Sequence, residues 1–147
     1  MPQAKTFFTA EQQQELIHAI RNAELETSGE IRLHLEESCG DDVLDRAADV
    51  FRKLEMHKTE LRNGVLIYLA VKDRQFAIIG DVGINEKVPE NFWDDIKDDM
   101  VLHFKQGNYI RGLLNAIETS GIQLKQYFPR SAGDINEMSD EISFRND

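Results

Sequence analysis

The sequence predicts an α/β fold: a three-layer α/β/α sandwich with a small mixed sheet of about three to four strands and about four helices. Residues 65–71 form an unbroken apolar run, which is typical of a strand buried on both faces at the middle of a sheet. The segments around it carry apolar residues at helical spacing. Because a sheet that is apolar on both faces needs a covering layer on each, these helices are expected on both sides.

The central strand is expected to continue into a hairpin. Residues 72–74 are a short charged turn, and residues 75–79 are predicted to return as an antiparallel strand that stops at Gly80. Residues 80–86 then form a loop with two glycines, two carboxylates and one carboxamide. A loop of this composition allows close approach of a ligand.

The segments before the hairpin predict a strand–helix–strand unit. Thr9 and Gln12 have the spacing of a capping box, which places a helix start near Ala10. Residues 30–36 alternate between apolar and polar side chains, which indicates a strand whose Arg32, His34 and Glu36 face water. Asp41 or Asp42 is expected to cap the helix that follows, and the two strands of this unit should be parallel.

Two more helices are predicted after the hairpin. The first is expected to begin at Pro89 and to end at Gly107, and the second to end before Pro129. We expect residues 1–129 to form a single domain. Residues 130–147 are polar, acidic and without period, which predicts a disordered acidic C-terminal tail.

Composition limits the classes of partner. A net charge of −10 opposes binding to nucleic acid and to anionic membranes, and it attracts cations and basic proteins, although solubility alone also explains an acidic surface. The single Cys39 fits a reducing compartment, and no signal peptide or membrane span is apparent. We therefore expect a cytoplasmic monomer that acts through an unknown protein partner.

Two acidic groups are candidates for a divalent-cation site, because hard cations such as Ca²⁺ or Mg²⁺ prefer oxygen ligands. The strand directions place them at opposite ends of the sheet. The first choice is the set Asp81, Glu86, Asn63 and Glu90, around the glycine-containing loop. The second choice is Asp41, Asp42 and Asp73, at the carboxyl ends of the parallel strands.

Each of these sets also has a purely structural interpretation. The polar side chains of the Asp81 loop can satisfy turn amides, and Asp41 and Asp42 can act as helix caps. Other chemistries find little support, since the four histidines lack zinc-ligand spacing and no Cys-x5-Arg loop follows Cys39.

The order of these elements, with four short stretches, resembles the TPM domain family. The stretches are residues 63–67, Asp73-Arg74, residues 80–83 and residues 104–112, and the likeness runs from Thr9 to about Phe128. The chain is similar to a short soluble bacterial form of the family. It departs from the family in reading Arg62-Asn63-Gly64 where members often have Asp-Asn-Gly, and it carries an extra carboxylate at Asp81.

The resemblance implies an α/β/α sandwich, acid phosphatase activity as in plant members, and divalent-cation binding as in some members. We therefore expect a calcium- or magnesium-binding domain that works as an interaction or regulatory module. One alternative is a metal-dependent acid phosphatase on phosphomonoesters, with Arg62 or Lys58 helping to hold the phosphate. The other is a metal-free scaffold for a basic protein partner.

Overall fold

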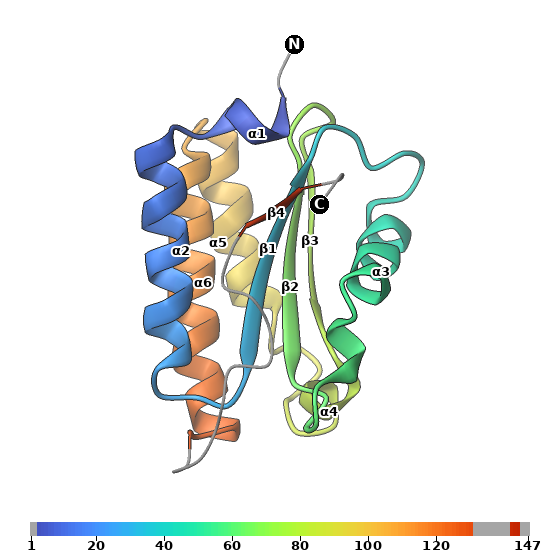
Figure 1. The fold of residues 1–147 in the computed structure, drawn as a ribbon, viewed down its shortest axis with the longest axis vertical. Coiled ribbons are helices and arrows are strands. Elements are labelled where there is room, and N and C mark those ends of the chain that lie inside the picture. Colours follow the sequence, from blue (N-terminus) through green and yellow to red (C-terminus); the bar gives the residue numbers. More distant parts are fainter. Residues whose placement is uncertain (1–2, 131–141, 145–147) are drawn as a thin grey trace.

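The structure, a computed structural model, describes residues 3–130 and 142–144. In these residues a four-stranded sheet lies between two layers of helices, which confirms the predicted three-layer sandwich (Figure 1). The strands are β1 (Glu30–Glu36), β2 (Gly64–Ala70), β3 (Gln75–Gly80) and β4 (Ser143–Phe144). The α-helices are α1 (Ala4–Phe7), α2 (Ala10–Glu24), α3 (Val43–Lys53), α4 (Val82–Asn85), α5 (Asp94–Lys105) and α6 (Tyr109–Tyr127), with a 3₁₀ turn η1 (Met56–Lys58).

The sheet is mixed, in the order β3-β2-β1-β4. β1 and β2 are parallel along their whole length, from the pair Glu30 and Gly64 to the pair Glu36 and Ala70. β2 and β3 form the predicted antiparallel hairpin. The loops that follow β1 and β2 therefore lie at one end of the sheet, and the loop that follows β3 lies at the other.

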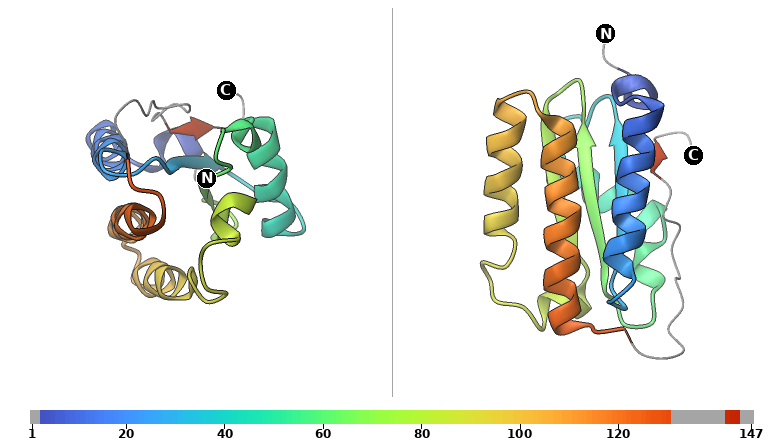
Figure 2. Two further views of the ribbon diagram at one scale, coloured as in Figure 1. Left: turned by 90° about the horizontal axis from the view of Figure 1, so that it is seen from below. Right: turned by 90° about the vertical axis from the view of Figure 1, so that its left-hand side faces the viewer.

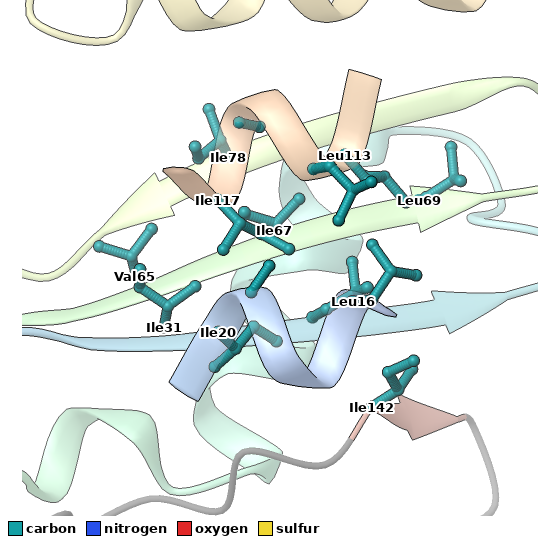
Figure 3. Packing of buried hydrophobic residues seen from close by; sticks show 14 of the residues in the cluster. Leu16, Ile20, Ile31, Val65, Ile67, Leu69, Ile78, Leu113, Ile117 and Ile142 are labelled. Carbon is teal, nitrogen blue, oxygen red and sulfur yellow. The ribbon is translucent and has the colours of Figure 1, made fainter. Parts of the chain in front are cut away.

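Two separate clusters of buried side chains hold the layers together. On one face, α2, α5 and α6 lie side by side against the sheet, and leucines and isoleucines of α2 and α6 pack on those of β1, β2 and β3 (Figures 2 and 3). On the other face α3 packs over a smaller cluster that includes Phe51 and Tyr68, and Met56 of η1 belongs to the same cluster (Figure 1). Every residue of β2 is buried, as expected for the central strand. Among the described helices, none combines the length and apolar character needed to cross a bilayer.

The helix starts follow the local capping chemistry. Thr9 Oγ1 accepts from the Gln12 backbone N–H and the Gln12 side chain accepts from the Thr9 N–H, which confirms the predicted capping box and the start at Ala10. The helix expected from Pro89 begins later, at Asp94, because residues 90–93 form turns. α1 and α4 are single-turn helices too short for a periodic pattern, and α4 lies within residues 80–86, which the sequence predicted as a loop.

The C-terminal region requires a correction. Ser143–Phe144 forms β4, which pairs in parallel with His34 and Leu35 of β1. Ile142 is buried in the main core and Ser143 is fully buried. The prediction of a disordered tail is therefore wrong for residues 142–144, and also for Arg130, whose backbone N–H donates to the Glu26 carbonyl oxygen at 3.1 Å. The rest of that prediction, residues 131–141 and 145–147, lies outside the described residues.

Candidate functional site

The structure keeps the two acidic groups apart, at opposite ends of the sheet. At one end, the loop after β1 meets the β2–β3 turn, and Ser38 Oγ donates a 2.7 Å hydrogen bond to Asp73 Oδ2. At the other end, Asp81 follows β3 and caps the short helix α4. This is the arrangement that the parallel pairing of β1 with β2 dictates.

At the first-choice end, the Asp81 carboxylate is a partner of Arg62. Arg62 Nε donates to Oδ2 at 2.8 Å and Nη2 donates to Oδ1 at 2.9 Å, while the Val82 backbone N–H donates to Oδ1 at 2.7 Å. The Asp81 side chain is 4% exposed, whereas that of Arg62 is 45% exposed. Both carboxylate oxygens therefore already accept strong hydrogen bonds, and the nearest charge is positive.

The other first-choice residues do not gather around this carboxylate. Asn63 is buried, and its Nδ2 donates to Ser28 Oγ at 3.4 Å. Glu86, which ends α4, and Glu90 are both exposed. Among the described residues, no hydrogen bond or ion pair joins any of these three side chains to Asp81.

At the second-choice end, the Asp73 carboxylate is held by three donors on a single oxygen. The Ser38 hydroxyl, the Cys39 backbone N–H at 2.9 Å and the Cys39 thiol at 3.5 Å all donate to Oδ2. No described residue donates to Oδ1. Asp73 and its neighbours Ser38 and Asp41 line an open pocket of about 470 Å³.

The local hydrogen bonds set the charge of this pocket. Hydrogen bonds from Ser38 and then from the Cys39 backbone hold the pKa of Asp73 below its usual range, so it is a carboxylate at neutral pH. Burial and then the Asp73 carboxylate raise the pKa of the Cys39 thiol, which keeps its proton. The pocket is therefore negative, and its thiol is a hydrogen-bond donor rather than a nucleophile.

The two remaining aspartates of this end differ in role. Asp42 Oδ1 accepts from the backbone N–H groups of Leu44 at 2.9 Å and Asp45 at 3.1 Å, so Asp42 is the cap of α3. Asp41 is exposed and lines the pocket. In the part of the chain that the structure describes, no three histidine, cysteine, aspartate or glutamate side chains converge as a ready metal centre.

A buried polar network on β1 was missed by sequence reasoning. Glu36 is fully buried and accepts from Arg46 Nε at 2.7 Å, from Arg46 Nη2 at 2.8 Å and from the Tyr68 hydroxyl. His34 Nε2 lies 3.1 Å from Glu36 Oε1, and its Nδ1 lies 2.8 Å from Ser143 Oγ. The expectation that His34 and Glu36 face water is wrong: both are buried, because Arg46 of α3 pairs with Glu36 and Ser143 of the neighbouring strand β4 contacts His34.

Charge compensation explains how this face tolerates burial. Burial alone raises the pKa of Glu36, but hydrogen bonds from Arg46, His34 and Tyr68 outweigh it and hold the pKa well below its usual range. Burial and the hydrogen bond to Glu36 raise the pKa of Tyr68 above its ordinary value. The sequence held two signals of this network: Tyr68 stands among apolar residues of β2, and an arginine, Arg46, lies on α3. Neither signal by itself indicates Glu36 as the hydrogen-bond partner.

The fold and the paired loops at the ends of β1 and β2 define a small α/β/α domain with an acidic pocket at the carboxyl ends of its parallel strands. The chain belongs to the TPM domain family, which matches residues 3–121. A comparison with curated proteins finds no match.

Solved structures agree with this assignment. The chain is similar to the BA42 protein of the psychrophilic bacterium Bizionia argentinensis, whose NMR structure is 50% identical in sequence, with a TM-score of 0.89 over 95% of this chain and 96% of that chain. It also resembles the N-terminal domain of a protein from P. gingivalis, at 21% identity and a TM-score of 0.67 over 84% and 82% of the two chains. The N-terminal domain of the cg2496 protein from Corynebacterium glutamicum, at 13% identity, has a TM-score of 0.65 over 90% and 82%. The last two likenesses show a shared fold only.

Proposed function

We propose that this TPM domain binds a divalent cation, Ca²⁺ or Mg²⁺, in the pocket formed by Ser38, Asp41 and Asp73, and that it serves as an interaction or regulatory module. One observation carries the proposal. Three donors fix the Asp73 carboxylate through Oδ2, whereas Oδ1 accepts a hydrogen bond from no described residue. Asp73 lines an open acidic pocket. Its Oδ1 is the first ligand of the proposed site.

The chemistry of the pocket suits a hard cation. Carboxylates, hydroxyls and backbone carbonyls are the ligands that Ca²⁺ and Mg²⁺ prefer. Asp73 and Asp41 supply carboxylates, and the net charge of −10 raises the local concentration of cations. Because few protein ligands converge here, the ion would retain several of its waters, and we expect a dissociation constant on the order of 10⁻⁴ to 10⁻³ M.

The opposite end supports a cation less well. A cation at Asp81 would have to displace Arg62 from a two-point ion pair and would then lie beside the freed guanidinium. At Asp73 the existing donors are a hydroxyl, an amide and a neutral thiol, so no ion pair has to break. For this reason the second predicted set, rather than the first, is our choice for the site.

Amide NMR shifts during a CaCl₂ titration, repeated with MgCl₂, test the proposal. We expect saturable shifts at residues 38–42 and 72–74, and we expect Asp73→Asn to remove them. Asp81→Asn is the matched control, since it neutralises an aspartate at the far end of the sheet. Saturable shifts centred on residues 81–86 would move the site to the first predicted set, and no saturable shift would leave the metal-free scaffold as the better interpretation.

The same samples separate cation binding from the phosphatase alternative. Turnover of a phosphomonoester reporter at saturating Ca²⁺ or Mg²⁺, lost in Asp73→Asn, would assign catalysis to the pocket. Cation binding without turnover would support the interaction module. We expect the second result, because the described part of the pocket presents no activated nucleophile and its thiol remains protonated.

A further inference from the structure

A groove of about 380 Å³ lies between α2 and α6, which run side by side in the layer of three helices (Figure 2). Small residues line it where the two helices meet, namely Ala19 and Ala23 of α2 and Gly121 of α6. The helices are in close contact there, since a Cβ on Gly121 would lie 2.6 Å from the Ala23 Cβ. Because no long side chain fills the space between helices that meet through such small residues, the surface is hollowed.

A large exposed apolar side chain stands at this groove. Ile122 of α6 lines it and is 70% exposed, and Leu25, which ends α2 next to the groove residue Glu26, is 67% exposed. A single exposed leucine or isoleucine is ordinary on a protein surface. Here, however, a projecting side chain and a hollow that can receive one lie on the same face of the molecule. An interface between two identical copies about a two-fold axis requires this kind of self-complementary surface.

Two residues of opposite charge flank Ile122 on α6. Glu118 lies four positions before it and Lys125 three positions after it, so the three side chains share one face of the helix. Together with Gly121 they occupy positions i, i+3, i+4 and i+7, which form one hole in knobs-into-holes packing. Lys125 Nζ lies 3.1 Å from Glu26 Oε2 in an exposed pair. Glu118 is also exposed, and it pairs with no described cation.

We propose that two copies of this chain associate through this groove about a two-fold axis, with α6 antiparallel to α6 of the second copy. Ile122 of one copy then packs over Gly121 of the other, and Glu118 lies opposite Lys125 of the other, twice by symmetry. A parallel arrangement would place each of these charges beside its own copy, so the charges select the antiparallel one. The sequence predicted a monomer because it shows neither the groove nor the exposure of Ile122.

The dimer is expected to be weak. One groove and its rim bury less than the roughly 800 Å² per partner of a standard interface. Two copies that each carry a net charge of −10 also repel one another, most strongly at low salt. We expect a dissociation constant on the order of 10⁻⁴ M at about 0.15 M salt. The groove shares no residue with the proposed cation pocket, so the association can be measured with EDTA present.

Sedimentation equilibrium in EDTA, from about 20 µM to about 1 mM protein, tests the association. Ile122→Ser should weaken it by at least about tenfold, because each copy loses a large apolar side chain from the interface. Leu102→Ser is the matched control, since Leu102 is 55% exposed on α5 and does not line the groove. Amide NMR shifts that grow with protein concentration should fall on residues 19–26 and 118–125.

An exchange of charges tests the antiparallel register. Glu118→Lys and Lys125→Glu, each alone, place like charges opposite one another and should weaken association by about tenfold, whereas the double variant restores both pairs and should associate within about threefold of the wild type. Asp98→Lys, which changes the net charge equally on the exposed surface of α5, should not weaken association. The proposal is overturned if the wild type stays monomeric at about 1 mM, if Ile122→Ser associates as the wild type does, or if the double variant associates no better than the single ones.

Discussion

The Glu36 carboxylate on β1 accepts two hydrogen bonds from the Arg46 guanidinium on α3, at 2.7 and 2.8 Å, and thereby joins the sheet to α3. Glu36 is fully buried, while the Arg46 side chain is 19% exposed. The charge of Glu36 is therefore balanced inside the protein rather than by water. Removing either partner leaves the other without its counterpart.

We predict that Glu36→Gln lowers the free energy of unfolding by about 3 kcal/mol, because breaking a buried pair leaves a charge uncompensated. Urea unfolding followed by circular dichroism measures this change. Lys125→Gln is the control, since Lys125 and Glu26 form an exposed pair at 3.1 Å whose loss should cost less than about 1 kcal/mol. If both variants lost the same small amount of unfolding free energy, the buried pair would contribute no more to stability than the exposed one, which would contradict this prediction.

The low pKa of Glu36 also predicts an acid dependence. A carboxyl whose pKa is lower in the folded than in the unfolded state stabilises the fold above its unfolded value, here about 4.5, and this stabilisation is lost as the pH falls below it. The wild-type advantage over Glu36→Gln should shrink by about 1.4 kcal/mol per pH unit below that value. Urea unfolding of both proteins at several pH values measures it, and an advantage that stays constant down to pH 3 would disagree with this account.

β4 and the residue before it, Ile142, are predicted to stabilise the domain although the strand has only two residues. Ile142→Ala should cost about 2–4 kcal/mol, because Ile142 is 7% exposed in the main core. Ser143→Ala should cost about 1–2 kcal/mol, because it removes the hydroxyl 2.8 Å from His34 Nδ1 in a fully buried site. Thermal or urea unfolding gives both values. Wild-type stability in both variants would show that residues 142–144 contribute nothing to the stability of the domain.

Gly83 is predicted to be irreplaceable for steric reasons. A Cβ there would lie 2.1 Å from the Leu61 carbonyl oxygen and 2.6 Å from that of Arg62. Gly83→Ala should therefore lower the free energy of unfolding by more than about 3 kcal/mol or prevent folding. Gly107 is the comparison, since its φ of 76° disfavours a side chain but its Cβ would meet open space. Gly107→Ala should cost only about 1–2 kcal/mol in unfolding experiments. The reverse order of the two losses would be inconsistent with the structure.

The layer order and the sheet followed from local signals in the sequence. The apolar run of β2 predicted its central position, and the Thr9 capping box predicted the start of α2. β4 could not be predicted in this way, because Ser143–Phe144 is too short for a periodic pattern and gains its stability from distant residues of β1. Because the sequence showed neither β4 nor the pairing of Arg46 with Glu36, the alternating residues of β1 indicated one exposed face.

The candidate site was harder to predict than the fold. The sequence placed Asp73 near Asp41 and Asp81 near Asn63 from strand directions alone, and the sheet confirms that division. The preference for Asp81 came from the type of residues in its loop. What a sequence does not show is that Arg62, nineteen positions earlier, already occupies both oxygens of that carboxylate. Side-chain pairing across elements decides which carboxylates remain available.

The central claim is that a divalent cation binds at Asp73 and not at Asp81. Calorimetric titration of Ca²⁺ into the wild type, Asp73→Asn and Asp81→Asn tests it most directly. We predict that Asp73→Asn weakens the affinity by at least about tenfold, because it removes a charged ligand, and that Asp81→Asn changes it less than about twofold. A loss of affinity in Asp81→Asn with wild-type binding in Asp73→Asn would contradict the account.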